Sequence, residues 1–197
     1  MKQFSKACER NTEPIAEVLA ELLPAADGGL VVEVGSGTGQ HAVAFARRFP
    51  HLLWQPTNRP GRLASIEAWR RDAGLENLLT PLPFDLFDDD PPVEHAELVM
   101  AINVIHIAPF EATDKLFEHA AQLLSVGSPI LLYGPYRYRD RSLEPSNERF
   151  DAFLKKRDPE SGLRLFEDVD AIASNHGFKH VQTRRLPANN DAHWWMR

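Results

Sequence analysis

The most constraining feature of the sequence is a short apolar segment that leads directly into three alternate glycines. Residues 30–34 read Leu-Val-Val-Glu-Val, and such a run between glycines predicts a strand buried on both faces. Gly35, Gly37 and Gly39 follow, and the apolar residues of 42–49 then have helical spacing. Glycine lets a backbone turn tightly and approach a ligand closely. The segment therefore predicts a strand, a ligand-contacting loop and a helix.

Strands and helices alternate along the rest of the chain, which favours an α/β fold with a mostly parallel sheet and helices on both of its faces. Only residues 187–191 separate the last two predicted strands, so these two should pair antiparallel. Helices are expected from Pro14 up to Asp27-Gly28-Gly29 and around 42–49, 63–69, 112–123 and 166–173, and strands at 30–34, 52–54, 78–82, 97–103, 130–133, 178–186 and 192–196.

Length and composition favour one globular domain over residues 1–197, with the polar segment 134–165 as an insertion or lid within it. Cys8 is the only cysteine, so no intramolecular disulfide can form and a cytoplasmic location is expected. No secretory signal and no apolar run of membrane-spanning length are found, so no membrane partner is expected. A net charge of −6 disfavours a nucleic-acid partner. The oligomeric state is not predicted.

The glycine segment suits a ligand that carries both an amino group and a carboxylate. Glu33 supplies negative charge, and the helix that starts at Gly39 supplies unpaired N–H groups. S-adenosylmethionine (SAM) has both groups. A dinucleotide fingerprint would need glycine at position 40, where the chain has Gln40, so NAD is less favoured. The alternative interpretation is that these glycines only make a tight strand-to-helix turn.

Short motifs also link the chain to a known family. They include Glu9-Arg10-Asn11, Gly37-Thr38-Gly39-Gln40-His41, Trp54-Gln55-Pro56, Ile105-His106-Ile107, Tyr133-Gly134-Pro135, Pro145-Ser146-Asn147, Arg157-Asp158-Pro159 and Pro187-Ala188-Asn189-Asn190. On these motifs the chain resembles the DUF938, or methyltransferase-like 26, family, and residues 32–39 resemble motif I of class I methyltransferases. The resemblance implies a Rossmann-like fold of seven strands with SAM as cofactor, held by Glu33, Gly35, Ser36, Gly37, Thr38, Gly39 and His41.

Further cofactor contacts are expected where later strands end. Class I enzymes usually carry an acidic residue after the second strand for the ribose hydroxyls, whereas this chain has Asn58, which predicts weaker cofactor binding because an amide brings no charge. Asp85 and Leu86 follow the third strand, where the adenine is expected, and the alternative is that Asp85 only caps a loop among the acidic residues 88–90. The backbone of Asn103, after the fourth strand, is expected near the sulfonium.

His106 is the best candidate for a catalytic base. Methyl transfer is an in-line displacement, so the protein mainly aligns the acceptor and, where the acceptor is protonated, removes a proton. A neutral imidazole three residues after Asn103 suits that role near pH 7. A histidine flanked by Ile105 and Ile107 is equally well explained as a half-buried packing residue.

Other polar residues are candidates for the acceptor pocket. Asn11 is also suited to cap the helix expected at Pro14, turn chemistry alone also explains Asn189, and the mixed charges of 134–165 also fit a solvated face. No Cys/His spacing indicates a metal, and the chain lacks the Asn/Asp-Pro-Pro-aromatic motif of enzymes that methylate base amines. The acceptor candidates are Arg10, Asn11, Tyr133, Tyr136, Asn147 and Asn189.

These features together predict a SAM-dependent methyltransferase that acts on a small molecule. The alternative is a protein that binds the cofactor without catalysis, which Asn58 favours.

Overall fold

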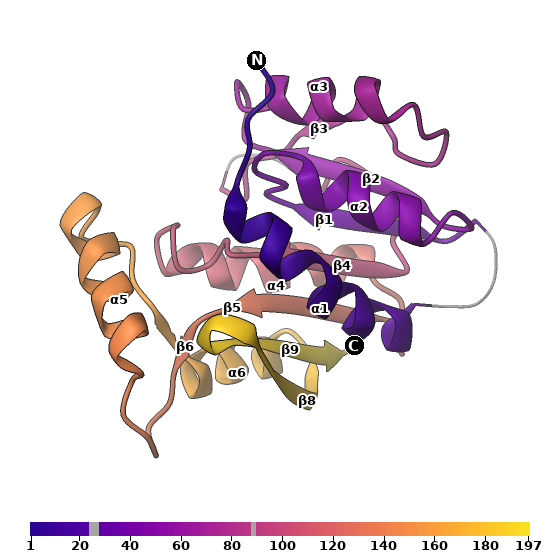
Figure 1. The fold of residues 1–197 in the computed structure, drawn as a ribbon. Coiled ribbons are helices and arrows are strands. Elements are labelled where there is room, and N and C mark those ends of the chain that lie inside the picture. Colours follow the sequence, from indigo (N-terminus) through magenta and orange to yellow (C-terminus); the bar gives the residue numbers. More distant parts are fainter. Residues whose placement is uncertain (24–27, 88–89) are drawn as a thin grey trace.

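A computed structural model describes residues 1–23, 28–87 and 90–197 of the chain. Its main feature is a seven-stranded sheet in the order β3-β2-β1-β4-β5-β9-β8 (Figure 1). The pairings are parallel except for those of β9, which runs antiparallel to both β5 and β8. The predicted α/β fold with an antiparallel last strand is confirmed. The strands are β1 (Leu30–Val34), β2 (Leu53–Asn58), β3 (Leu82–Pro83), β4 (Leu98–Ile102), β5 (Pro129–Gly134), β8 (Lys179–Leu186) and β9 (Asn190–Met196).

Helices cover both faces of the sheet, as Figure 1 shows. One apolar core joins the sheet to α1 (Lys6–Leu22) and α2 (Gln40–Arg48), with α3 (Ala64–Ala73) packed against it. The other core joins the opposite face to α4 (Glu111–Leu123) and α6 (Phe166–Asn175). Side chains alternate between the two cores along β1, because successive residues of a strand point to opposite faces. Among the described residues, no helix is both long and apolar enough to cross a membrane.

The first helix begins earlier than the sequence predicts. Helix α1 starts at Lys6 with Ser5 as its N-cap, so Pro14 lies inside it rather than at its start. Arg10 and Asn11 therefore lie within the helix, and Asn11 is buried there instead of capping it. Because the first two turns are polar, the apolar periodicity that marks the helix in the sequence becomes visible only after Pro14. The expected end at Asp27 lies outside the described residues.

The third strand is shorter and later than expected. Only Leu82–Pro83 pair with β2, and Leu78 contributes an isolated bridge to Trp54. Pro81 and Pro83 have no N–H group to donate, which limits the ladder there. The acidic neighbours Asp88 and Asp89, with which Asp85 was grouped, lie outside the described residues.

The segment 134–165 contains α5 (Pro145–Arg157) between two short strands, β6 (Tyr136–Arg137) and β7 (Arg164–Leu165), that pair in parallel. Helix α5 lies to one side of the sheet, beyond the carboxyl end of β5 (Figure 1). Asp151 anchors it, because its Oδ1 accepts a hydrogen bond from Leu163 N at 2.8 Å and its Oδ2 accepts one from Arg137 Nη1 on β6 at 3.4 Å. In the sequence only Phe150, Phe153 and Leu154 indicate a short helix here.

Candidate functional site

The glycine loop lies between β1 and α2, as predicted, and hydrogen bonds to β2 and within the loop fix its shape. Ser36 N donates to Thr57 O on β2 at 2.8 Å, and Gly39 N donates to Ser36 O at 2.9 Å. Gly39 caps α2 with a φ of 93°, in the left-handed region that favours glycine. A side chain there would also meet α3, because an added Cβ would lie 2.7 Å from Ile66 Cα. Gly39 thus permits the close approach of two helices.

A cavity of about 800 Å³ opens at the carboxyl ends of β1, β2 and β3, and we call it the glycine-loop cavity. In open α/β sheets this edge is where ligands bind, and the volume falls within the roughly 300–1,000 Å³ of small-molecule sites. The structure brings together here six of the residues predicted to bind the cofactor. They are Gly35, Gly37, Thr38, Asn58, Asp85 and Leu86.

Gly37 leaves room that a side chain would fill, whereas Gly35 packs against the opposite wall. An added Cβ at Gly37 would have Gly35 O, at 4.0 Å, as its nearest heavy atom, so any larger side chain would extend into free space. At Gly35 an added Cβ would lie 2.9 Å from Val104 Cγ2, on the opposite wall. The loop is therefore shaped so that a ligand can contact its backbone.

Asn58 and Asp85 line the cavity, and each also accepts a hydrogen bond from a backbone N–H group of its own loop. Asn58 Oδ1 accepts from Arg59 N at 2.9 Å, and Asp85 Oδ1 accepts from Phe87 N at 3.2 Å. Both interpretations of Asp85, as a loop cap and as a residue of the ligand pocket, are thus compatible with the structure. Arg59 and Arg62 line the same cavity beyond β2 and were missed in the sequence, although residues directly after a strand are expected at this edge.

Glu33 lies behind the glycine loop rather than in the cavity lining. Its side chain is 2% exposed, and Oε2 accepts a hydrogen bond from Trp54 Nε1 at 3.1 Å. Burial raises the pKa of Glu33 to about 7, and the hydrogen bond from Trp54 opposes this shift. Around neutral pH this carboxyl group is therefore partly protonated, and a cation near it would favour its charged form.

Ser36 and His41 also support the loop from behind. Ser36 Oγ donates to Glu33 O at 3.3 Å, and His41 Nε2 donates to Cys8 O on α1 at 3.3 Å. Burial lowers the pKa of His41 to about 4, so its imidazole is neutral at physiological pH. The proposed cofactor contacts of these residues stay predictions.

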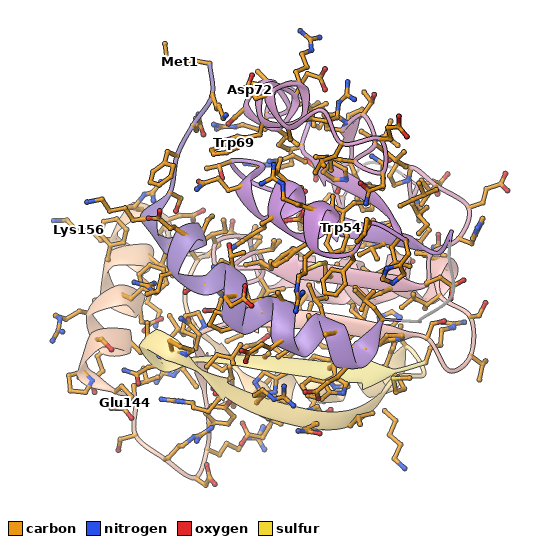
Figure 2. The ribbon with its side chains drawn as sticks, turned by 45° about the vertical axis from the view of Figure 1, so that its right-hand side comes forward. Met1, Trp54, Trp69, Asp72, Glu144 and Lys156 are labelled. Atoms are coloured by element: carbon orange, nitrogen blue, oxygen red, sulfur yellow. The ribbon has the colours of Figure 1, made fainter. Side chains whose placement is uncertain are left out.

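The N-terminal segment forms a wall of the cavity that the sequence did not indicate. Met1 and Gln3 line the cavity, and Gln3 N donates to Ser65 Oγ at 2.8 Å. Lys2 pairs with Asp72 at 2.6 Å, and Figure 2 shows Met1 on the same side of the molecule as Asp72 and Trp69. No local pattern marks this segment, because long-range hydrogen bonds hold it in place.

Asn103 and His106 lie in the segment between β4 and α4, next to the end of β5 and outside the cavity lining. Asn103 adopts a left-handed φ of 57°, which is uncommon for a residue with a side chain and is often found at functional sites. The His106 ring packs against Gly134, where an added Cβ would be 3.0 Å from His106 Nδ1. The ring also contacts Phe150 on α5, and the centroids of the two rings are 6.1 Å apart. The two residues are therefore neighbours at the end of β5.

His106 is enclosed and neutral. It is 1% exposed, and among the described residues no group forms a hydrogen bond with its Nε2. Burial lowers the pKa of His106 to about 3, with a smaller contribution from the charge of Arg164. Gly162 N donates to His106 O at 2.9 Å, and Arg164 Nε holds the preceding residue by donating to Ile105 O at 2.8 Å.

The acceptor candidates separate into two groups. Arg10, Asn11 and Tyr133 lie on the α1 side, where burial raises the pKa of Tyr133 to about 12 while the charge of Arg10 opposes the shift. Asn147 and Asn189 meet at the start of α5, where Asn147 Nδ2 donates to Asn189 O at 2.9 Å. Tyr136 lies on the opposite face of the sheet and, with Asn147, lines a second cavity. Within the described residues, no three His, Cys, Asp or Glu side chains are grouped to hold a metal ion.

Comparison with known proteins places this geometry in a family. The model of the family described as "Protein of unknown function (DUF938)" matches residues 2–197. The chain belongs to the DUF938 family. The resemblance drawn from the short motifs is thereby confirmed.

The DUF938 chain is also similar in structure to solved methyltransferases. An O-methyltransferase family protein from Burkholderia thailandensis superposes with a TM-score of 0.78 at 18% identity over 97% of this chain and 57% of its own. Human N-acetylserotonin methyltransferase in complex with SAM superposes with a TM-score of 0.80 at 18% identity, over 98% of this chain and 53% of its own. An O-methyltransferase family 2 protein from Planctomyces limnophilus, in complex with apigenin, superposes with a TM-score of 0.77 at 17% identity, over 95% of this chain and 62% of its own. The fold is therefore the Rossmann-like methyltransferase fold, and the chain spans between about half and three fifths of each of these proteins.

Proposed function

We propose that this DUF938 chain is a SAM-dependent methyltransferase that acts on a small-molecule acceptor. The observation that carries the proposal is the glycine-loop cavity, in which Gly35, Gly37 and Thr38 meet the ends of β2 and β3. The similarity in fold to a methyltransferase solved with SAM supports the proposed cofactor. The similarity to another one solved with apigenin supports a small-molecule acceptor.

The residues present fit SAM. The space that a side chain at Gly37 would fill is available to the ligand, and the N–H groups at the start of α2 favour its carboxylate. Asn58 would hold the ribose hydroxyls, and Asp85 with Leu86 would hold the adenine. Because Glu33 is enclosed behind the loop, its charge would act on the ammonium group through space rather than by contact.

When bound, SAM supplies a methyl group on a cationic sulfur that is ready for displacement. The contribution of the chain is alignment of the acceptor and removal of a proton from it. We assign the second task to His106, whose neutral imidazole leaves Nε2 able to accept a proton. Because Phe150 packs against this ring, its side chain has to move before an acceptor can reach His106 from that side.

A second candidate function is cofactor binding without catalysis. Two observations favour it: Asn58 stands where a carboxylate would bind the ribose more strongly, and His106 is enclosed. Binding of the cofactor without any methylated product in a metabolite extract would support this candidate.

The first experiment is titration of the chain with S-adenosylhomocysteine in a calorimeter. We expect micromolar binding that Gly37→Val abolishes, because the valine side chain would occupy the ligand space. Gly127→Val is the matched control, since Gly127 also has a positive φ but has no heavy atom within 4 Å of an added Cβ and lies outside the cavity. Equal affinities for the wild type and Gly37→Val would contradict the assigned cofactor site.

Asn58→Asp is expected to tighten the binding of S-adenosylhomocysteine about fivefold. A carboxylate keeps the hydrogen bond from Arg59 N and adds a charge-assisted bond to the ribose, which is worth roughly 1 kcal/mol more than a neutral one. The same titration measures the change, with the exposed Asn175→Asp as the charge-matched control. A dissociation constant that stays the same in Asn58→Asp would remove Asn58 from the proposed ribose site.

A further inference from the structure

A second cavity, of about 400 Å³, lies at the other end of the sheet, and we call it the β8–β9 cavity. It lies between the strands β8 and β9 and the segment that leads into α5. Glu144, the N-cap of α5, lines it, and Figure 2 shows Glu144 and Lys156 near opposite ends of that helix. Its polar lining includes Tyr136, Tyr138, Arg141, Asn147, Arg185 and Asp191.

Two residues of this lining each carry a buried polar atom that has no hydrogen-bond partner among the described residues. These atoms are the hydroxyl of Tyr136 and Oδ1 of Asp191, in side chains that are 3% and 1% exposed. The other oxygen of Asp191 is satisfied, because Oδ2 accepts from Tyr138 OH at 2.6 Å and lies 3.4 Å from Arg185 Nη1. A buried polar group without a partner destabilises a fold by about 1–3 kcal/mol, so a ligand that pairs with both atoms would bind favourably.

The chemistry of these two atoms selects the group that can satisfy them. Burial, and then the nearby Tyr138 and Asp191, raise the pKa of Tyr136 well above its usual value, so its phenol stays protonated and can donate. Asp191 Oδ1 can only accept. A hydroxyl group both donates and accepts, whereas an ammonium group would leave the Tyr136 hydrogen without an acceptor.

The charges of the lining favour an uncharged ligand. Glu144 and Asp191 are acidic and Arg141 and Arg185 are basic, so the formal charges of the lining balance. Arg185 already joins the two acidic groups, at 3.6 Å from Glu144 and 3.4 Å from Asp191. A ligand with a net charge would upset this balance.

We propose that the β8–β9 cavity binds a small hydroxylated molecule through Asp191 Oδ1 and the hydroxyl of Tyr136. That this molecule is the methyl acceptor rests on the proposed function, whereas the binding site itself does not. Asp191 pairs with Gly134 across β5 and β9, and paired positions project their side chains from the same face. The His106 ring packs against Gly134 on that face, so the cavity and the proposed base are neighbours.

Three small probes test the hydroxyl assignment. They share a benzene ring and differ in one substituent: benzyl alcohol, toluene and benzylamine. Titration of the isotope-labelled chain, followed by NMR, gives each affinity and locates the site through the amide signals of Asn147 and Thr183, which line the cavity. We expect the alcohol to bind about tenfold more tightly than the methyl compound and more tightly than the amine.

Two variants and a control complete the test. Tyr136→Phe removes only the unpaired hydroxyl, so the chain should fold as before and bind the alcohol about tenfold more weakly. Asp191→Asn should weaken binding similarly, although it also alters the contacts with Tyr138 and Arg185. Asp168→Asn is the control, because Asp168 pairs with Arg139 on the surface outside the cavity.

Several results would overturn the proposal. They are equal affinities for the three probes, unchanged signals of the cavity residues, wild-type affinity in Tyr136→Phe, or tightest binding of the amine. S-adenosylhomocysteine, titrated into the same samples, keeps the two proposals apart. Its binding without that of the alcohol would reject only the hydroxyl site, and the reverse result would reject only the cofactor site.

Discussion

His106→Ala is expected to lower methyl transfer about a hundredfold while the affinity for S-adenosylhomocysteine stays unchanged. General base catalysis contributes about 10²–10⁴-fold, and the lower end applies because a group whose pKa is about 3 is a weak base. Transfer is measured by mass spectrometry of a metabolite extract incubated with SAM that carries a labelled methyl group.

His106→Gln distinguishes catalysis from packing. Glutamine keeps most of the side-chain volume but cannot serve as the base, so a catalytic role predicts that both variants lose transfer. A packing role predicts full turnover per folded molecule in His106→Gln. His176→Gln, at a surface hydrogen bond with Asp114, controls for the general effect of removing a histidine.

The pH profile adds an independent check on His106. Its folded-state pKa of about 3 lies below the usual 6.5, so the imidazole stays neutral as the pH falls from 8 to 5. Protonation of His106 therefore should not reduce transfer in this range. A wild-type loss of activity with a midpoint near pH 6.5 that disappears in His106→Gln would show that His106 is exposed in the reacting state.

Gly39→Ala is expected to destabilise the fold by about 3 kcal/mol and to lower the thermal unfolding midpoint by roughly 6–12 °C. Two effects add: the left-handed φ of 93° is strained for alanine, and the new Cβ would lie 2.7 Å from the backbone of Ile66. Calorimetric or circular-dichroism melting measures the change.

Gly74→Ala separates the effect of backbone strain from that of the steric clash with Ile66. Gly74 has a φ of 60° at the end of α3, but an added Cβ there meets no heavy atom within 4 Å. Only strain remains, so we expect a loss of about 1 kcal/mol. Similar melting shifts for the two variants would show that α2 and α3 separate easily and that the close approach is not required.

The fold could be predicted where the local sequence pattern of an element agrees with the place of that element in the fold. The apolar residues 30–34 form β1 within the predicted bounds, and the short loop before Asn190 forces the antiparallel pairing of β8 and β9. The sequence pattern does not predict an element that long-range contacts hold in place or one that is very short. The first turns of α1 are polar and are held by contacts such as that from Ser5, and β6 and β7 are too short to leave a periodic signal.

The candidate site could be predicted in part for a similar reason. Gly37, Asn58 and Asp85 follow strands that end at one edge of the sheet, so strand order alone brings them together. Gln3 reaches the same cavity only through a hydrogen bond to Ser65, which no spacing in the sequence could indicate. The unpaired oxygen of Asp191 likewise depends on the positions of Tyr138 and Arg185.

Gln40 links the choice of cofactor to the architecture of the chain. Its side chain bonds to both backbone groups of Ser5, accepting from N at 2.5 Å and donating to O at 3.4 Å, and Thr38 Oγ1 donates to it at 3.1 Å. A glycine at this position would restore the dinucleotide spacing but would release the segment that walls the cavity. Conversion to a dinucleotide site would therefore need a new wall as well as a new loop, so the proposed SAM site and a dinucleotide site are separated by more than one substitution.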